Sequence, residues 1–314
     1  MGVYLHSLSA VFMIFCLMAV GYVLGMLGWM DAGAKKFVSR FVVNIAVPMN
    51  CITGILNNFN RSDLAGMGRY LLVPFCTIVV NLAISLLAAK FLQLPRNRFG
   101  VFVAMAFLSN TLFIGLALST QLFGEQAVGY VMLYYIGCTV FTQTVCVMLV
   151  ESSGTAAPKE HSAGAFIKDI FTKPPILGLI AAVTMLLLEV RPPEMFMSFA
   201  KYLSSTVSPL ALLYCGYIVY ELGIRNIRME RGIPTMLVLR LLVAPAICAA
   251  VCMLVGVEGL CRNVFIVEAA LPTVSQITVM AGAYGADEEY SATGAILSML
   301  GIFITVPVLM VMLT

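Results

Sequence analysis

The chain has 314 residues, of which 61% are hydrophobic and 11% are charged, with a formal net charge of +3. Its mean hydropathy is +1.01, whereas in soluble domains about a quarter of the residues are charged. This composition excludes a soluble globular protein, and apolar runs of about 20 residues predict an all-α membrane protein rather than a β-barrel.

Ten apolar segments of bilayer-spanning length follow one another along the chain. They cover residues 7–28, 36–57, 67–91, 99–123, 127–150, 174–190, 202–222, 233–256, 263–284 and 290–313. The first six residues carry no Lys or Arg, and no cleavage site follows a short apolar core, so we expect the first segment to be a retained helix. The longest connection, 152–172, is polar and separates two predicted five-helix halves, 1–151 and 173–314.

Positive charges in the short loops predict the orientation of the chain. With both termini outside the cytoplasm, the inner loops hold twelve Lys and Arg residues and the outer loops hold five. The twelve are at positions 35, 36, 40, 90, 96, 98, 159, 168, 173, 225, 228 and 231, and the five are at 61, 69, 191, 201 and 262. We therefore expect both termini to be extracytoplasmic.

Two of the segments are interrupted by residues that do not suit a straight helix. In the ninth, Pro272 removes a backbone donor and lies among hydroxyl residues, so we expect the helix to break there. In the fourth, Ser109, Asn110 and Thr111 form a triplet that caps helix starts better than it continues a helix. Broken backbone at membrane depth survives only inside protein or beside a watery cavity, as in the substrate sites of secondary transporters.

The two halves of the chain can be laid over one another. The matched pairs are Arg69 with Arg240, Pro74 with Pro245, and Pro48 with Pro209. Residues 102–110 align without gaps on 265–273, which pairs Ala106 with Ala269. Five segments per half invert the second copy, so the pattern predicts inverted repeats with a site between them near the bilayer midplane. The alternative is chance similarity among apolar helices.

The polar residues of the two breaks are the predicted binding site. An amide such as Asn110 can simply hold helices together, but its place beside two hydroxyls favours a substrate contact. Helix starts expose N–H groups and a partial positive charge, so two of them suit an anion. The predicted substrate-binding residues are Ser109, Asn110, Thr111, Pro272, Thr273, Val274, Ser275 and Gln276, with Pro48 and Asn50 of the second segment.

Glu268 is the acid that lies well inside an apolar segment, a costly position that indicates function by default. Apolar surroundings favour the neutral form, so Glu268 is the predicted proton-coupling residue. A structural carboxyl, capped by a hydroxyl or paired with an Arg, is an equal alternative. Arg240 is a candidate partner, but we expect it to extend toward the membrane surface.

Other chemistries find little support in the sequence. The nine cysteines show no Cys-x-x-Cys spacing, and the two histidines lie in different polar segments. We therefore expect no disulfide, no metal site, no catalytic residue and no cofactor. No nucleotide-binding loop of the P-loop type is present, so direct ATP drive is not expected, and nucleic acid is not an expected partner.

Four motifs in order carry a family likeness: FVVNIAVP at 41–48, SNTLFIG at 109–115, EAALP at 268–272, and the segment 297–307. Together they resemble the auxin efflux carrier family, which includes plant PIN-type carriers and bacterial malonate or malate permeases. The resemblance implies ten helices in two inverted five-helix repeats, with helices 4 and 9 crossing near the bilayer midplane. It also implies a scaffold of helices 1, 2, 6 and 7, a transport domain of helices 3–5 and 8–10, and a homodimer formed through the scaffold.

The resemblance also implies roles for individual residues. Asn110 and Pro272 fall on the family's two crossing residues. Glu268 stands where plant relatives tend to carry an amide, so auxin specificity does not carry over. The short central loop is similar to that of prokaryotic members, which implies a multi-pass protein of the bacterial inner membrane.

The leading interpretation is a secondary active transporter, a permease or efflux carrier for a small organic anion such as a mono- or dicarboxylate. It would work by alternating access of an elevator type in the lipid bilayer, with a proton or a sodium ion as the coupling ion. An intramembrane enzyme is disfavoured, because a lone acid has no paired acid, Cys/His pair or metal cluster. The alternative is a membrane receptor or a lipid- or sterol-sensing module on the same fold.

Overall fold

The structure is a computed structural model that describes residues 2–61, 68, 70–155, 172–223, 227–274 and 276–313. Within these residues every regular element is a helix, and a single isolated β-bridge joins two loops. The predicted all-α class is therefore confirmed. The linker prediction for 152–172 falls mainly on residues outside this description, as does Arg69.

The first half contains helices over each of its five predicted segments. They are α1 (Gly2–Met26), α2 (Ala32–Phe41) with η1 (Val42–Ala46) and α3 (Val47–Asn58), α5 (Leu72–Phe91), α6 (Arg96–Phe107), η2 (Thr111–Gly115) with α7 (Leu116–Phe123), and η3 (Glu125–Ala127) with α8 (Val128–Phe141), η4 (Thr142–Cys146) and α9 (Val147–Ser153). Asp31 starts α2 because its side chain accepts a hydrogen bond from the Ala34 amide at 2.7 Å. Gly124, at φ +80, ends α7 in the left-handed region that glycine tolerates.

The second half is built in the same manner. Its helices are α11 (Pro174–Leu187), α12 (Glu194–Ser204) with α13 (Val207–Leu222), α14 (Ile233–Val238) with η6 (Leu239–Val243) and α15 (Ala244–Val255), α16 (Gly259–Ala269), α17 (Gln276–Tyr284) and α18 (Glu288–Leu313). The segments η1, η2, η4 and η6 are π-helical turns, a feature that is rare in helices and frequent at functional sites.

Six helical segments of the described chain are long and apolar enough to cross a membrane. They are Ala32–Asn58, Leu72–Phe91, Glu125–Ser153, Glu194–Leu222, Ile233–Val255 and Glu288–Leu313, and shorter apolar helices lie at Phe15–Met26, Thr111–Phe123 and Pro174–Leu187. The chain is thus a multi-pass membrane protein, and the count of ten spans stays a prediction. The seventh segment begins earlier than the predicted residue 202, since α12 starts at Glu194 behind Pro193.

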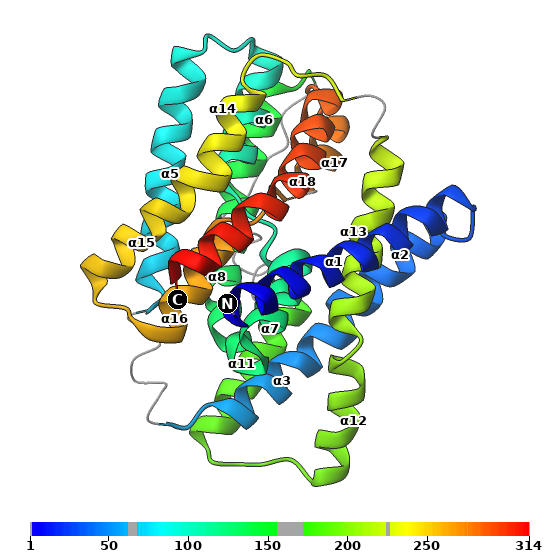
Figure 1. The fold of residues 1–314 in the computed structure, drawn as a ribbon, viewed down its shortest axis with the longest axis vertical. Coiled ribbons are helices and arrows are strands. Elements are labelled where there is room, and N and C mark those ends of the chain that lie inside the picture. The colour runs from blue at the N-terminus through cyan, green and yellow to red at the C-terminus, as the bar shows by residue number, and fades with distance from the viewer. Residues whose placement is uncertain are drawn as a thin grey trace.

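The helices of the two halves pack across each other (Figure 1). Helix α1 lies against α13, and α3 lies against α11 and α12, whereas α5 packs against α6, α8 and α15. Small residues allow the closest of these approaches. A Cβ on Gly21 would lie 2.1 Å from the Leu213 carbonyl oxygen, and one on Gly216 would lie 1.9 Å from that of Met18. Backbone thus meets backbone between α1 and α13, a contact typical of membrane helices.

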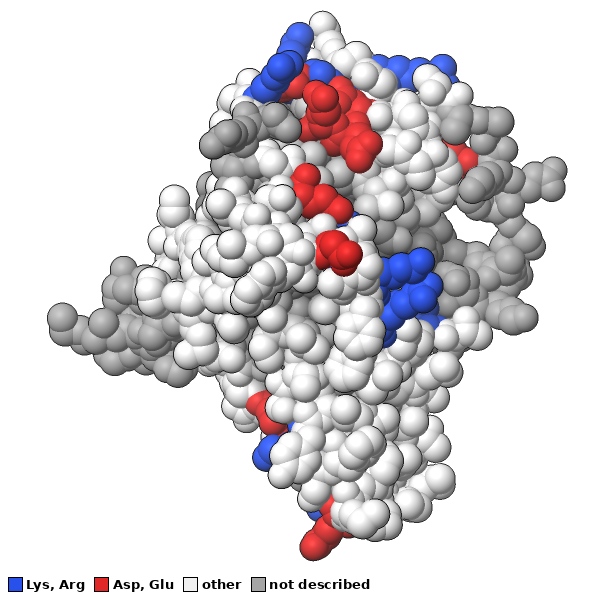
Figure 2. Space-filling model, turned by 90° about the vertical axis from the view of Figure 1, so that its right-hand side faces the viewer, with Lys and Arg blue, Asp and Glu red and all other residues white. Residues whose placement is uncertain are grey.

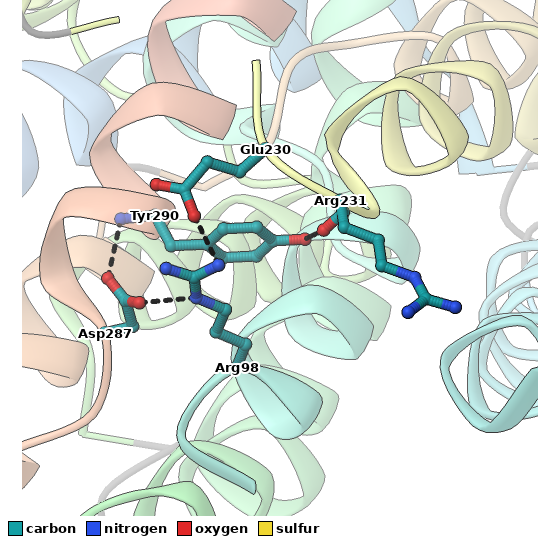
Figure 3. Close-up of polar contacts among 5 residues, drawn as sticks. All are labelled: Arg98, Glu230, Arg231, Asp287 and Tyr290. Carbon is teal, nitrogen blue, oxygen red and sulfur yellow. Dashed lines mark hydrogen bonds and ion pairs between the residues drawn. The ribbon is translucent and has the colours of Figure 1, made fainter. Parts of the chain in front are cut away.

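Charged side chains gather mainly in the upper part of the face in Figure 2, and uncharged side chains cover most of the rest. One partly exposed cluster of charged residues, the Arg98 cluster, connects α6 to the loops before α14 and α18 (Figure 3). The Arg98 guanidinium pairs with Glu230 and, at 2.6 Å, with Asp287, and it lies 5.1 Å from the centre of the Tyr290 ring. Asp287 also caps α18, because its carboxylate accepts from the Tyr290 amide at 2.9 Å.

Candidate functional site

The two broken helices meet at their breaks. Helix α6 ends at Phe107 and α16 ends at Ala269, and each resumes after a short irregular segment. Ser109 and Thr273 form an antiparallel β-bridge, and the Asn110 amide donates to the Pro272 carbonyl oxygen at 2.9 Å. The unpaired backbone groups of one break are therefore partly satisfied by the other, which is how a break at this depth is tolerated.

Side chains complete the two breaks. The Asn110 carboxamide oxygen accepts from the Phe113 amide at 3.4 Å and so caps the helix that resumes there, the role predicted for the Ser-Asn-Thr triplet. The Thr273 amide donates to the Ser298 hydroxyl at 3.2 Å, which ties the second break to α18. The Thr273 hydroxyl is buried without a hydrogen-bond partner.

A cavity of about 1020 Å³ opens beside this junction. It is lined by five of the predicted site residues: Ser109, Asn110, Thr111, Val274 and Gln276. Residues that follow a helix break, at the start of η2 and of α17, thus face one shared space. Sequence reasoning missed other lining residues, for which no local signal exists: α8 and η4 contribute Tyr135, Thr139 and Thr142, and α13 contributes Tyr214.

Other predicted site residues lie elsewhere. Pro272 and Thr273 lie inside the junction rather than on the cavity wall, and Thr273 is fully buried. Pro48 packs against Gly178, and the Asn50 side chain accepts from the Ser204 hydroxyl at 2.6 Å. These two residues hold α3 to α11 and α12, so a substrate role for them finds no support in this arrangement. Ser275 lies outside the described residues.

Charged residues line the far end of the cavity. Lys35 and Glu221 form an ion pair at 2.5 Å between α2 and α13, and both line the cavity together with Lys173 and Glu288. The inner part, at the two breaks, is lined by hydroxyl, amide and apolar groups. The cavity therefore combines a charged mouth with an uncharged polar floor.

Comparisons with known proteins identify the family of the chain. A sequence profile described as membrane transport protein matches residues 6–310. The chain belongs to the membrane transport protein family. This is the auxin efflux carrier family indicated by the sequence motifs.

Relatives of this transport protein extend over nearly its full length. An uncharacterized transporter of Methanocaldococcus jannaschii is 22% identical over 290 residues, which cover 91% of this chain and 92% of the relative. An uncharacterized transporter of Methanothermobacter thermautotrophicus is 25% identical over 284 residues, which cover 89% of each chain.

In this membrane transport protein Glu268 lies behind the junction and does not line the cavity. Its side chain is fully buried, and one carboxyl oxygen accepts from the Ser119 hydroxyl of α7 at 2.7 Å. The other oxygen is buried without a hydrogen-bond partner and lies against Gly115. The hydrogen bond from a hydroxyl group that we expected for a structural carboxyl is present. The second carboxyl oxygen has no hydrogen-bond partner, and the role of Glu268 in proton coupling stays a prediction.

Arg240 corrects an expectation. Its side chain does not extend to the membrane surface but is 1% exposed inside the protein. It donates to the Ala106 carbonyl oxygen at 3.5 Å and to that of Ala269, and among the described residues no acidic side chain forms an ion pair with it. The expectation was wrong: the position of Arg69, the matched residue near the edge of its own segment, suggested a similar place for Arg240, whereas η6 places Arg240 between the C-terminal ends of α6 and α16.

Proposed function

We propose that this chain is a secondary active transporter for a small organic anion, a mono- or dicarboxylate, that works by alternating access. The observation that carries the proposal is the cavity at which both interrupted helices resume, floored by Asn110 and Gln276. The resumed helices run over residues 111–123 and 276–284, and their first turns present N–H groups and the positive end of the helix dipole. With Lys and Glu only at the mouth, dipoles and amides would hold the anion, which favours reversible binding.

The repeat architecture is part of the proposal. Residues 1–151 and 173–314 would form two inverted five-helix repeats, with helices 4 and 9 crossing near the midplane. The packing of α1 on α13 and of α11 on α3 supports this, because an inverted repeat exchanges these two pairs. The packing of α5 on α6 and of α15 on α16 forms a second exchanged set.

The same contacts support the proposed domain assignment. Helices 1, 2, 6 and 7 would be the scaffold, and helices 3–5 and 8–10 the transport domain. Helix α7 packs against α1 and α13, whereas cavity space lies beside α17, at Thr278, Val279 and Gly282. The cavity thus extends toward Lys35 and Lys173, which the loop charges assign to the cytoplasm. This conformation would be the inward-facing one of the cycle.

Substrate recognition is tested with a matched pair of amides. Asn110 and Asn50 are both 5% exposed, but only Asn110 lines the cavity. We expect Asn110→Ala to weaken binding by about tenfold, the effect of one hydrogen bond to a charged group, and Asn50→Ala to lower stability without changing affinity. The measurement is counterflow in proteoliposomes with a panel of radiolabelled acetate, butyrate, malonate and succinate. Counterflow with none of these anions, or equal affinities in the two variants, would refute the anion site.

The coupling hypothesis concerns Glu268. A carboxyl that gives up its proton when the transport domain opens would repel a neighbouring anion, which links substrate and proton binding. Glu268→Gln mimics the protonated form and should exchange substrate without accumulating it under a proton gradient. Ser119→Ala is the control that removes the hydroxyl cap while retaining the acid. Identical pH profiles of binding in the wild type and Glu268→Gln would reject proton coupling and leave sodium or simple exchange.

A further inference from the structure

Arg240 joins the two broken helices at their C-terminal ends, next to the breaks. Its guanidinium donates to the carbonyl oxygens of Ala106, in the last turn of α6, and of Ala269, the last residue of α16. The last carbonyls of a helix have no partner within the helix. Ala106 and Ala269 are also the residues that the gap-free alignment of the two halves pairs with each other. One side chain thus binds equivalent carbonyls of both halves.

The charge of Arg240 has no acidic partner at this site. In the described chain it enters no ion pair, and the Glu268 carboxyl bonds instead to Ser119. A buried cation without compensation is strongly unfavourable. Two helix C-termini carry about −0.5 elementary charge each, so together they match one guanidinium. The pairing of one arginine with two helix ends therefore accounts for a buried charge that no carboxylate neutralises.

We propose that Arg240 is a positioning residue that locks the C-terminal ends of α6 and α16 together and thereby sets the anion preference of the cavity. It neutralises the negative ends of the two half-helices, while the positive ends of the resumed helices stay open toward Asn110 and Gln276. The field beside Asn110 and Gln276 is then net positive, although no Lys or Arg lines that part of the cavity. Lysine offers one ammonium in place of a planar fork and cannot serve two separate carbonyls equally well. The effect on anions rests on the proposed function, and the lock itself does not.

The lock is tested by hydrogen–deuterium exchange of the whole protein in detergent, with no substrate present. We expect Arg240→Met to raise exchange about tenfold or more in peptides covering 104–112 and 266–274, as expected for the loss of charge-assisted hydrogen bonds. Arg240→Lys should restore part of the protection. Arg191→Met removes the same charge from an exposed loop and should change neither region. Peptides from α1 and α13 serve as the internal reference.

The outcomes separate the lock from general stability and from transport. Exchange that is unchanged in Arg240→Met, or raised equally in α1 and α13, overturns the proposal. If Arg240→Met does not fold, Arg240→Lys decides, since a local rise at the two breaks supports the lock and wild-type exchange overturns it. Counterflow then tests the charge preference: in Arg240→Met, uptake of butyrate should fall relative to uptake of uncharged butyramide, and Arg240→Lys should lie between this variant and the wild type. A local exchange effect without any counterflow in the wild type would retain the lock and refute only the transport function.

Discussion

Substituting Gly115 with alanine should disturb the buried acid of this transporter. A Cβ at this position would lie 2.2 Å from one Glu268 carboxyl oxygen, 2.8 Å from the other and 2.5 Å from Leu271 Cδ1. Ordinary contacts begin at 3.4 Å, so the carboxyl group must retreat by about 1.2 Å (3.4 minus 2.2). Its 2.7 Å bond from Ser119 cannot survive such a shift.

The expected cost is the sum of two effects. Overpacking a filled interior costs about 1–3 kcal/mol, and a buried carboxyl that loses its hydrogen bond costs about 1–3 kcal/mol more. Alanine gains only about 1 kcal/mol over glycine in helix propensity. The two costs together are about 2–6 kcal/mol, so after subtraction of the propensity gain the net destabilisation should be about 1–5 kcal/mol.

The assay is thermal unfolding followed with a thiol-reactive fluorophore, because Cys51, Cys146 and Cys215 are among the buried free cysteines that unfolding exposes. Gly294→Ala is the control. A Cβ there would lie 2.5 Å from Met105 Sδ, in a flexible thioether chain that can move. We expect a clearly lower melting temperature for Gly115→Ala than for Gly294→Ala.

A double-mutant cycle tests the stated cause. Glu268→Ala removes the carboxyl group with which the new methyl group of Gly115→Ala would clash. The loss of unfolding free energy in the double variant should therefore be smaller, by about 1–3 kcal/mol, than the sum of the losses in the two single variants. Strict additivity, or equal melting temperatures for Gly115→Ala and Gly294→Ala, would refute the contact between Gly115 and Glu268.

Three further predictions concern the framework. Gly216→Ala should separate α1 from α13 and lower the melting temperature by more than Gly137→Ala does. The reason is that a Cβ on Gly216 would lie 1.9 Å from the Met18 carbonyl oxygen, whereas one on Gly137 would lie 3.2 Å from Pro74. Equal melting temperatures of the two variants would contradict the close approach of α1 and α13. Arg98→Gln removes the cation between the Glu230 and Asp287 carboxylates (Figure 3) and should therefore loosen the loops before α14 and α18. Limited proteolysis would detect this as faster cleavage in these loops, and a wild-type cleavage pattern would contradict a stabilising role of the Arg98 cluster. A tag at the C-terminus should be labelled from outside intact cells, and labelling only after permeabilisation would reverse the predicted orientation.

The class of the protein and the places where its helices break could be predicted from the order of the residues alone. Apolar runs of spanning length require helices, since a lipid environment leaves backbone groups no other partner. Pro272 and the capping side chain of Asn110 act on the backbone within a few residues, so their effect can be predicted from the neighbouring sequence. Family motifs are likewise local strings, and they identified the transporter family.

The residues that these local features contact could not be predicted in this way, because they come from distant parts of the chain. Ser119 and Glu268 are 149 positions apart, and Arg240 reaches Ala106 across 134 positions. Their partners depend on how helices rotate and cross, and a π-helical turn in η6 changes that rotation without an evident sequence signal. The same dependence turned Asn50 toward Ser204 rather than toward the cavity. Periodicity fixes which residues share one helix face, but the neighbour of that face is set by packing of the whole bundle, because apolar helices offer many near-equivalent ways to pack.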